Sequence, residues 1–308
     1  MSLSDLGAEP ARPWLAETLH RELDGRWATP QLRTETGSTN DDIARFAEDH
    51  GIGAGAWALV AARYQRAGRG RRGRSWQAAD GDAVLFSVAT RLQVPAERWP
   101  SASLIVGHAV VETLRQLLPA DAPRDLLGLR WPNDVLVGKH HLKVGGVLCE
   151  RIQPPHAATG EALWIAGVGV NLRAPLEPHL TASGTGLLTL LSAEDAARLA
   201  PETLIGQLAQ GIARHIDAWQ LRGGFLLPDL HGESLRFCDG EVGLDLGDGR
   251  RVAAWLCGID RVGALLVRDV VDGAPVGPKR SVIALRVLDA RTDPPWHHPP
   301  DPAPHPAD

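Results

Sequence analysis

The sequence has little cysteine and no long apolar run. Its three cysteines, Cys149, Cys238 and Cys257, form no C-x-x-C pair, so neither a disulfide framework nor a zinc site is expected. The N-terminal residues lack the basic and apolar regions of a secretion signal, and no apolar stretch reaches membrane length. These absences predict a cytoplasmic protein with reduced thiols and no membrane association.

Lysine is also scarce, and the chain carries no overall positive charge. Only three of its 32 basic residues are lysine, Lys139, Lys143 and Lys279, so a retained lysine hints at a chemical need that arginine does not meet. The net charge of -5 argues against a general polyanion binder. With 308 residues and 44% hydrophobic residues, the chain can form one large domain and a small one.

One stretch is densely basic against this acidic background. Residues 63–76 place five arginines within nine positions and space four of them with glycine, directly after an apolar run at 56–62 that predicts a buried strand. Glycine lets a backbone approach a ligand closely, and each guanidinium offers a planar fork to phosphate or carboxylate oxygens. This segment therefore predicts a loop that wraps an anion, starting from a phosphate-bearing ligand.

Three other interpretations of the loop must be weighed. Gly68, Gly70 and Gly73 satisfy the dinucleotide pattern G-x-G-x-x-G, but that pattern needs a helix beginning inside it, and a strand-like segment at 83–90 follows instead. A solvated arginine-rich loop and a nucleic-acid patch are not separated by the loop alone.

Hydrophobic periodicity elsewhere predicts an α+β chain. Helices are expected within residues 1–30, after the capping cluster at 37–42, at 99–118 and at 204–221. Strands are expected at 129–137, 142–150 and 162–172, and short alternating segments at 235–288 predict a small antiparallel barrel or sandwich. The tail at 292–308 is rich in proline and histidine, which predicts disorder.

Several polar residues and glycines lie at the ends of these elements or within them, at positions that indicate a ligand pocket. Ser38, Thr39 and Asn40 fit a helix cap and a ligand contact equally well. Gly145 and Gly146 beside Lys143 predict a pocket floor, since glycine within a strand allows close backbone approach.

In their order along the chain, these motifs resemble those of the biotin protein ligases. The resemblance covers residues 38–171 through Ser38-Thr39-Asn40, Gln65, the glycine-arginine loop, Arg130-Trp131-Pro132-Asn133-Asp134, Lys143 with Gly145-Gly146, and Gly167-Val168-Gly169-Val170-Asn171. Residues 258–267 resemble part of the family's C-terminal domain more weakly. Arg130 stands where many relatives carry lysine.

The resemblance implies an α+β fold with two domains. A mixed-sheet catalytic domain of the biotin/lipoate ligase type with helices is expected over residues 31–230, and a small SH3-like β-barrel over 235–289. An N-terminal extension, 1–30, is too short for a DNA-binding domain, and 290–308 is expected to be a disordered tail. Neither DNA binding nor repression is therefore expected.

The implied activity is ATP-dependent biotin ligation. The family joins biotin to ATP as biotinyl-5′-AMP, releases pyrophosphate, and passes biotin to one lysine of a biotin carboxyl carrier protein domain of acetyl-CoA carboxylase or a related carboxylase. Mg²⁺ accompanies the ATP. Some relatives form a homodimer through the catalytic sheet, which the resemblance raises for this chain without establishing it.

The resemblance also assigns roles to individual positions. Biotin contacts are implied for Ser38, Thr39, Asn40, Gln65, Arg69, Gly70, Arg71, Lys143 and Gly146. ATP contacts are implied for Arg71, Arg74, Trp76, Asn133 and Asn171. Catalytic roles are implied for Lys143, Arg69, Arg71 and Asp134, with no metal ligand named.

These roles agree with the chemistry of the reaction. Two anions must be held together, and Arg69, Arg71, Lys143 and Mg²⁺ would offset their repulsion. Asp134 could attract or deprotonate the incoming amine, or act electrostatically. The alternatives are a lipoate or octanoate ligase of the same fold and, more distantly, a nucleic-acid-binding protein without catalysis.

Overall fold

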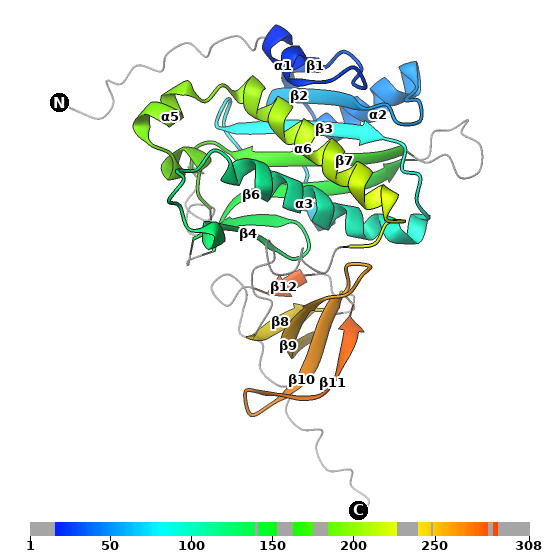
Figure 1. Ribbon diagram of the computed structural model, residues 1–308, viewed down its shortest axis with the longest axis vertical. Helices are drawn as coiled ribbons and strands as arrows, with labels where there is room; N and C mark the ends of the chain where they lie inside the picture. The colour runs from blue at the N-terminus through cyan, green and yellow to red at the C-terminus, as the bar shows by residue number, and fades with distance from the viewer. Residues whose placement is uncertain are drawn as a thin grey trace, which may run out of the picture.

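The structure is a computed structural model, and it describes residues 16–138, 141–152, 163–174, 184–226, 240–247, 249–282 and 286–288. A seven-stranded sheet forms the centre of the larger part, with strand order β1-β2-β3-β7-β6-β5-β4 (Figure 1). The strands are β1 (Gln31–Thr36), β2 (Ala58–Gln65), β3 (Ala83–Thr90), β4 (Leu127–Arg130), β5 (Asp134–Val137), β6 (Leu142–Ile152) and β7 (Leu163–Asn171). The pair β1 and β2 is parallel and the other pairs are antiparallel.

Helices cover both faces of this sheet. The helices are α1 (Ala16–Glu22), α2 (Thr39–His50), α3 (Trp99–Arg115), α5 (Ala193–Arg198) and α6 (Pro201–Leu221). In Figure 1, α3 and α6 lie side by side in front of the sheet, and α2 packs against β2 and β3 from the other side. Each face has its own apolar core, and the smaller one is formed by Ile43, Ala47, Val60, Ala89 and Ile165 among others. Because both faces of β3 are covered, all eight of its residues are buried.

The parallel pairing of β1 and β2 brings together two segments that later line the candidate site, the start of α2 and the loop after β2. Thr36 at the end of β1 lies opposite Gln65 at the end of β2. The carboxyl ends of parallel strands meet at one edge of a sheet, so the start of α2 and the loop after β2 both leave from that edge. The crossover helix α2 thus brings Ser38 and Thr39 next to Gln65.

The C-terminal part is a five-stranded antiparallel sheet. Its order is β11-β10-β9-β8-β12, from β8 (Gly240–Asp245), β9 (Arg251–Ile259), β10 (Leu265–Val271), β11 (Ala274–Val282) and β12 (Arg286–Leu288). Leu244, Leu256 and Val267 belong to the same buried core as Leu104 and Leu129 of the larger part. The antiparallel β prediction for this region is confirmed, whereas its closure into an SH3-like barrel stays a prediction.

Most of the predicted elements are present, with one correction. Residues 129–137 are not one strand but two, β4 and β5, which pair around a turn at Trp131–Asn133. Pro132 has no N–H to continue a ladder, and the Asn133 N–H instead donates to the Arg130 carbonyl at 3.1 Å. The predicted disordered tail lies outside the described residues. Within the described ranges, no helix combines the length and apolarity needed to cross a bilayer.

Candidate active site

A cavity of about 470 Å³ opens where the start of α2, the loop after β2, the turn between β4 and β5, and strands β6 and β7 meet. The predicted site residues that line it are Ser38, Thr39, Asn40, Gln65, Arg69, Gly70, Arg71, Arg74, Trp76, Asn133, Asp134, Lys143 and Gly146. Asn171 lines a neighbouring hollow instead. The structure therefore brings together all but one of the predicted residues, from segments more than a hundred positions apart.

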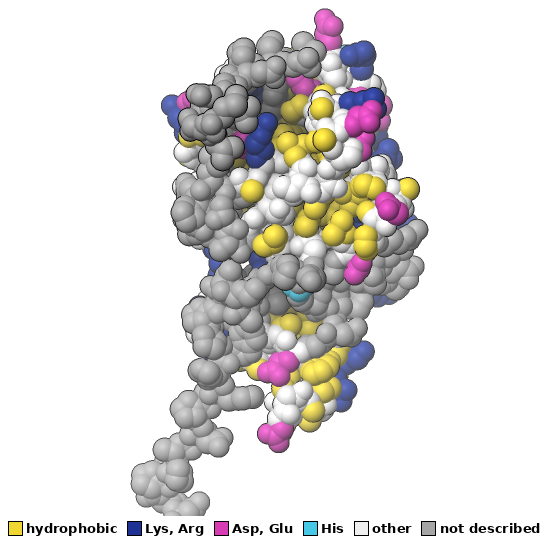
Figure 2. Space-filling view, turned by 90° about the vertical axis from the view of Figure 1, so that its left-hand side faces the viewer, with side chains coloured by type: hydrophobic (Ala, Val, Ile, Leu, Met, Phe, Trp, Pro, Cys, Tyr) yellow, Lys and Arg dark blue, Asp and Glu magenta, His cyan; other side chains and the backbone are white. Residues whose placement is uncertain are grey.

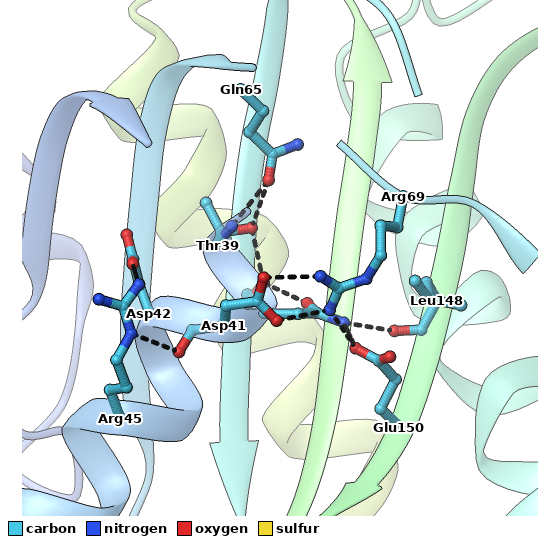
Figure 3. Close-up of polar contacts among 10 residues, drawn as sticks. Thr39, Asp41, Asp42, Arg45, Gln65, Arg69, Leu148 and Glu150 are labelled. Atoms are coloured by element: carbon cyan, nitrogen blue, oxygen red, sulfur yellow. Dashed lines mark hydrogen bonds and ion pairs between the residues drawn. The ribbon is translucent and has the colours of Figure 1, made fainter. Parts of the chain in front are cut away.

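One end of this cavity is a hydrogen-bond network of uncharged groups. The Gln65 Oε1 atom accepts from the Thr39 backbone N–H at 2.8 Å and from the Thr39 hydroxyl at 3.1 Å (Figure 3). Ser87 Oγ lies 2.7 Å from Thr39 Oγ1 and 2.5 Å from Asn40 Oδ1. Ser38 holds the N-cap position of α2, yet its side chain makes no capping bond. The hydroxyls at this helix start are thus wall groups of the cavity rather than caps.

Ser87 supports the network and was missed from the sequence. It is fully buried in the middle of β3, where residues on either side are apolar. A buried hydroxyl is costly without a partner, and this one has two, Thr39 and Asn40. The signal that could have found it is a lone serine inside an otherwise apolar strand.

Two glycines of β7 are required by close approach. A Cβ on Gly167 would lie 2.3 Å from Asn40 Oδ1, and one on Gly169 would lie 2.7 Å from the Trp76 ring. Gly146 of β6 also faces the Trp76 ring, at 3.2 Å from the position of a Cβ. Gly146 lines the cavity together with Gly167 and Gly169, as predicted for a pocket floor, whereas Gly145 is not among the lining residues and faces Val135 and Val170 instead.

The glycine-arginine loop folds back on itself as a small hairpin. Gly70 N–H donates to the Arg74 carbonyl at 2.7 Å, and Trp76 N–H donates to the Gly68 carbonyl at 2.8 Å. Arg72 adopts φ 63° at the tip, a conformation that is uncommon outside glycine. The loop contains no helix of the dinucleotide-binding kind, only one short turn at Arg71–Gly73. It returns so that the Trp76 ring lies over the pocket floor.

The other end of the cavity is strongly cationic. Six of the residues that line the cavity as a whole are basic, Arg69, Arg71, Arg72, Arg74, Arg130 and Lys143, against the single carboxylate of Asp134. Asp134 is held by cations through both oxygens, with Oδ1 at 2.7 Å from Lys143 Nζ and Oδ2 at 2.8 Å from Arg130 Nη2. Burial alone would raise the pKa of Asp134, but the charges of Lys143 and Arg130 outweigh it and lower the pKa to about 2. The carboxylate therefore stays ionised and fixes the position of Lys143.

Two further contacts define this cationic end. The Lys143 ammonium lies 5.3 Å from the centre of the Trp76 ring, within cation–π range. Arg71 is largely buried, which lowers its pKa, and its Nη1 lies 3.5 Å from Asn133 Oδ1. An arginine remains charged at neutral pH despite such burial, so Arg71 keeps a poorly hydrated positive charge within reach of Asp134.

The side chains present do not form a magnesium site of their own. Within the described part of the chain, no three His, Cys, Asp or Glu residues gather as a metal-binding group. Both oxygens of Asp134 already face cations. Mg²⁺ is commonly bound mainly through substrate phosphates and water, and its use by this protein stays a prediction.

A second hollow of about 480 Å³ shares a wall with the first. Gln65, Ser75 and Trp76 line both hollows, while Asn171 and Tyr64 line only the second. Asn171 is buried, and its Nδ2 lies 3.4 Å from the Thr185 carbonyl. Asn171 thus lies outside the first cavity, and its role as a nucleotide contact stays a prediction.

The C-terminal sheet reaches the site at two points. The Trp131 indole N–H donates to the Gly263 carbonyl at 2.9 Å, next to the turn that carries Asn133. Arg72 Nη1 at the loop tip lies 3.4 Å from Asp245 Oδ2. These contacts were not foreseen from the sequence, because no local pattern pairs residues so distant along the chain.

The fold and this cavity are those of the biotin and lipoate ligase class. Residues 53–171 match the biotin/lipoate A/B protein ligase family. The biotin–(acetyl-CoA-carboxylase) ligase of Mycobacterium tuberculosis is 32% identical over 283 residues, which cover 89% of this chain and 97% of that protein. The corresponding ligase of Paracoccus denitrificans is 31% identical over 61% of this chain and 72% of its own length. The chain belongs to the biotin protein ligase family.

Solved structures agree on the fold. A mutant form of the biotin protein ligase from Aquifex aeolicus, in complex with biotin, superposes with a TM-score of 0.60 at 20% identity, over 84% of this chain and 97% of that one. The biotin protein ligase of Leishmania major, in complex with biotinyl-5-AMP, gives 0.51 at 23% identity, over 85% and 98%. At these identities the likeness establishes the fold alone.

Proposed function

We propose that this chain is an ATP-dependent biotin protein ligase. It activates biotin as biotinyl-5′-AMP and transfers the biotinyl group to a lysine of a biotin carboxyl carrier domain, in acetyl-CoA carboxylase or a related carboxylase. The observation that carries the proposal is a single cavity with an uncharged hydrogen-bonding end at Thr39 and Gln65 and a cationic end at Arg71 and Lys143. This division matches a substrate with a neutral polar head and a carboxylate tail.

Biotin fits the cavity in one direction. Its ureido ring carries one carbonyl acceptor and two N–H donors, which the hydroxyls of Ser38 and Thr39 and the amide of Gln65 can serve. The Gln65 oxygen is turned toward Thr39, so its NH₂ group is left on the other side as a donor. With the ring at this end, the valeryl chain passes over Gly146 and carries the carboxylate to Lys143.

The first reaction then takes place at the cationic end. The biotin carboxylate oxygen attacks the α-phosphorus of ATP, the bond to the β-phosphate oxygen breaks, and pyrophosphate leaves. Lys143 and Arg71 lower the repulsion between the two anions and stabilise the charge that spreads over the phosphate oxygens. Lys143 suits this place because a compact ammonium can serve oxygens of both partners.

Asp134 is assigned a positioning role rather than the role of a general base. Both of its oxygens are engaged by Lys143 and Arg130, and a carboxylate with a pKa of about 2 is a poor proton acceptor at neutral pH. In the second reaction the carrier lysine amine attacks the biotinyl carbonyl, an amide forms, and AMP leaves. We place both reactions in the cytoplasm, where ATP and carrier domains meet.

The nearest alternative is a lipoate or octanoate ligase of the same fold. The end of the cavity at Ser38, Thr39 and Gln65 presents hydroxyls and an amide. A dithiolane ring or an alkyl chain offers these groups no matching donors or acceptors, whereas a ureido ring does. The structure thus favours biotin over lipoate on chemical grounds.

The described residues on the face shown in Figure 2 do not support a nucleic-acid-binding function. Among the coloured residues of Figure 2, basic and acidic side chains lie next to one another on the upper part of the face. Continuous basic surface is the usual signature of nucleic-acid binding. The cations of the loop are instead directed to a small cavity.

Exchange of labelled pyrophosphate into ATP tests the proposal. We expect exchange that depends on biotin and is not supported by lipoate or octanoate, followed by transfer of labelled biotin to a purified carrier domain. Exchange with lipoate alone would move the chain to the alternative function. Exchange with biotin but no transfer to any carrier domain would contradict the second half of the proposal.

A further inference from the structure

Arg69 differs from the other loop arginines in where its charge is directed. Its guanidinium makes a bidentate pair with Asp41, with Nη1–Oδ2 and Nη2–Oδ1 distances of 2.6 and 2.7 Å (Figure 3). Its Nη2 also lies 3.3 Å from Glu150 Oε2. Neither carboxylate lines the cavity. One cation of the cavity wall is therefore held from behind by two carboxylates, one from α2 and one from β6.

Glu150 connects this ion pair to the uncharged end of the cavity. Its Oε2 atom accepts a hydrogen bond from Asn40 Nδ2 at 2.5 Å, while the same amide nitrogen lies 3.4 Å from the Leu148 carbonyl. Asn40 Oδ1 is taken by Ser87 at 2.5 Å. The Asn40 amide is thus satisfied by the protein itself, and one carboxylate touches both the loop and the wall of the ureido end.

The charges around Arg69 indicate that its guanidinium pairs mainly with protein carboxylates rather than with a substrate. Bidentate pairing with a carboxylate is the strongest arrangement open to a guanidinium. The bond to Asp41 raises the pKa of Arg69, and the bond from Arg69 lowers the pKa of Asp41. With two carboxylates beside one cation, Arg69 contributes little net positive charge to the cavity, in contrast to Arg71 and Lys143.

We infer that Asp41 and Glu150 are positioning residues that hold the loop at 68–76 in its closed form through Arg69. Glu150 also links this closure to Asn40, which lines the uncharged end of the cavity. The inference rests on the proposed function and adds residues that govern how long the loop retains the acyl-adenylate. Opening of the loop requires Arg69 to leave both carboxylates. Weakening either one therefore opens the loop more often.

Trypsin cleavage of the ligand-free protein tests closure without using the activity. Arg72 and Arg74 are exposed on the loop, so cleavage after them, followed by mass spectrometry, reports how often the loop opens. Glu150→Gln removes the negative charge of Glu150 but keeps an oxygen that can accept the hydrogen bond from Asn40. Asp41→Asn removes the negative charge of Asp41, the other carboxylate that pairs with Arg69. We expect cleavage about three- to fivefold faster in each variant, as for an ion pair of modest strength.

Two comparisons separate a specific clamp from a general loosening. Glu35→Gln removes an exposed carboxylate that pairs with Arg66 at 2.9 Å just before the loop, and wild-type cleavage is expected there. In an Arg69→Ala background, Glu150→Gln should add nothing further, because its effect acts through Arg69. Wild-type cleavage in both Glu150→Gln and Asp41→Asn, or an undiminished Glu150→Gln effect without Arg69, would overturn the inference.

Dissociation of biotinyl-5′-AMP gives the second readout. Glu150→Gln and Asp41→Asn should release the intermediate about three- to fivefold faster, with less change in the single-turnover rate of its formation. If biotin supports no pyrophosphate exchange but loop cleavage changes as expected, the proposed function fails and the clamp stands. If exchange occurs but cleavage is unchanged, the clamp fails and the function stands.

Discussion

Lys143 is fixed from two sides although it projects into an open cavity. Its ammonium pairs with Asp134 at 2.7 Å and lies over the Trp76 ring, while β6 carries its backbone across the pocket floor. A flexible lysine with four rotatable bonds is thereby restricted before a substrate arrives. Such preorganised charge is the main way in which enzymes stabilise phosphoryl-transfer transition states.

Lys143→Ala is expected to lower the rate of adenylate formation by about a hundredfold or more, the range seen when one stabilising donor is removed. Lys143→Arg should restore only part of the rate, because a planar guanidinium does not replace a compact ammonium. Pyrophosphate exchange measures the rate, and circular dichroism checks the fold. Lys279→Ala, on exposed β11, is the matched lysine control and should behave as wild type. Wild-type exchange in Lys143→Ala would remove this residue from the mechanism.

Asp134 should make stability depend on pH in the acid range. Its pKa is about 2 in the folded protein against an ordinary value of 3.8, so the folded state holds the ionised form more tightly. The resulting stabilisation, about 2 kcal/mol, is fully present above pH 4 and is lost as the pH falls through 2. Urea unfolding at pH 7, 4 and 3 should show a weaker acid loss in Asp134→Asn than in wild type.

The control for this pH effect is Asp80→Asn. Asp80 pairs with Arg63 on the surface at 3.1 Å and is 56% exposed, so its removal should leave the acid dependence unchanged. An identical acid loss in wild type and Asp134→Asn would show that Lys143 and Arg130 do not stabilise the carboxylate in the folded state.

At the scale of secondary structure elements, the site depends on a close approach of α2 to β7. Asn40 in the first turn of α2 lies against Gly167, and Ser87 of β3, which pairs with Gly167, completes the contact. The helix start can reach the sheet only because β7 presents no side chain there. The small residues of β7 therefore set the depth of the uncharged end of the cavity.

Gly167→Ala is expected to push Asn40 out of place, because the added Cβ would lie 2.3 Å from Asn40 Oδ1. Overpacking of this kind costs about 1–3 kcal/mol of stability. The Michaelis constant for biotin should rise severalfold while that for ATP changes less. Gly53→Ala serves as the control, since a Cβ at Gly53 meets nothing within 4 Å. Equal effects of the two substitutions on the biotin constant would contradict the role of this contact.

The sequence predicted the elements that carry local signals and missed the contacts that only tertiary packing creates. The loop, the strand glycines and the start of α2 carry local signals, and the structure brings them into one cavity. The division of residues 129–137 into β4 and β5 was missed, because the apolar pattern outweighed the turn signal of Pro132. Glu150 was missed for another reason, since its partners Asn40 and Arg69 are chosen by tertiary packing alone.

At the scale of the whole molecule, the two sheets share one core. Gly263 of the C-terminal part packs against Leu104 and Ser101 of α3, and Leu226 N–H donates to the Arg261 carbonyl at 2.9 Å. Arg98 and Arg261, one from each part, both lie over the Phe225 ring, at 4.0 and 4.6 Å from its centre. We therefore expect the two parts to unfold in a single transition.

Trp131→Phe should weaken the packing of the C-terminal sheet on the larger part by removing the hydrogen bond to the Gly263 carbonyl. A buried carbonyl left without its donor costs about 1–3 kcal/mol. Trp99→Phe removes an equivalent 3.0 Å bond to Val94 within the larger part and is the matched control. Urea unfolding should show lower stability for both variants but a second transition only for Trp131→Phe. A single transition in both would show that this bond does not couple the parts.

The indole of Trp76 has a consequence for inhibitor design. Because Trp76, Gln65 and Ser75 line both hollows, a compound confined to the first hollow can bind with these side chains at rest, whereas a compound that spans both must move part of this shared wall, including the Trp76 ring that lies against Gly146 and Gly169. The spanning compound carries that reorganisation cost in its affinity. Compounds confined to the first hollow should therefore gain more affinity per atom than compounds that span both.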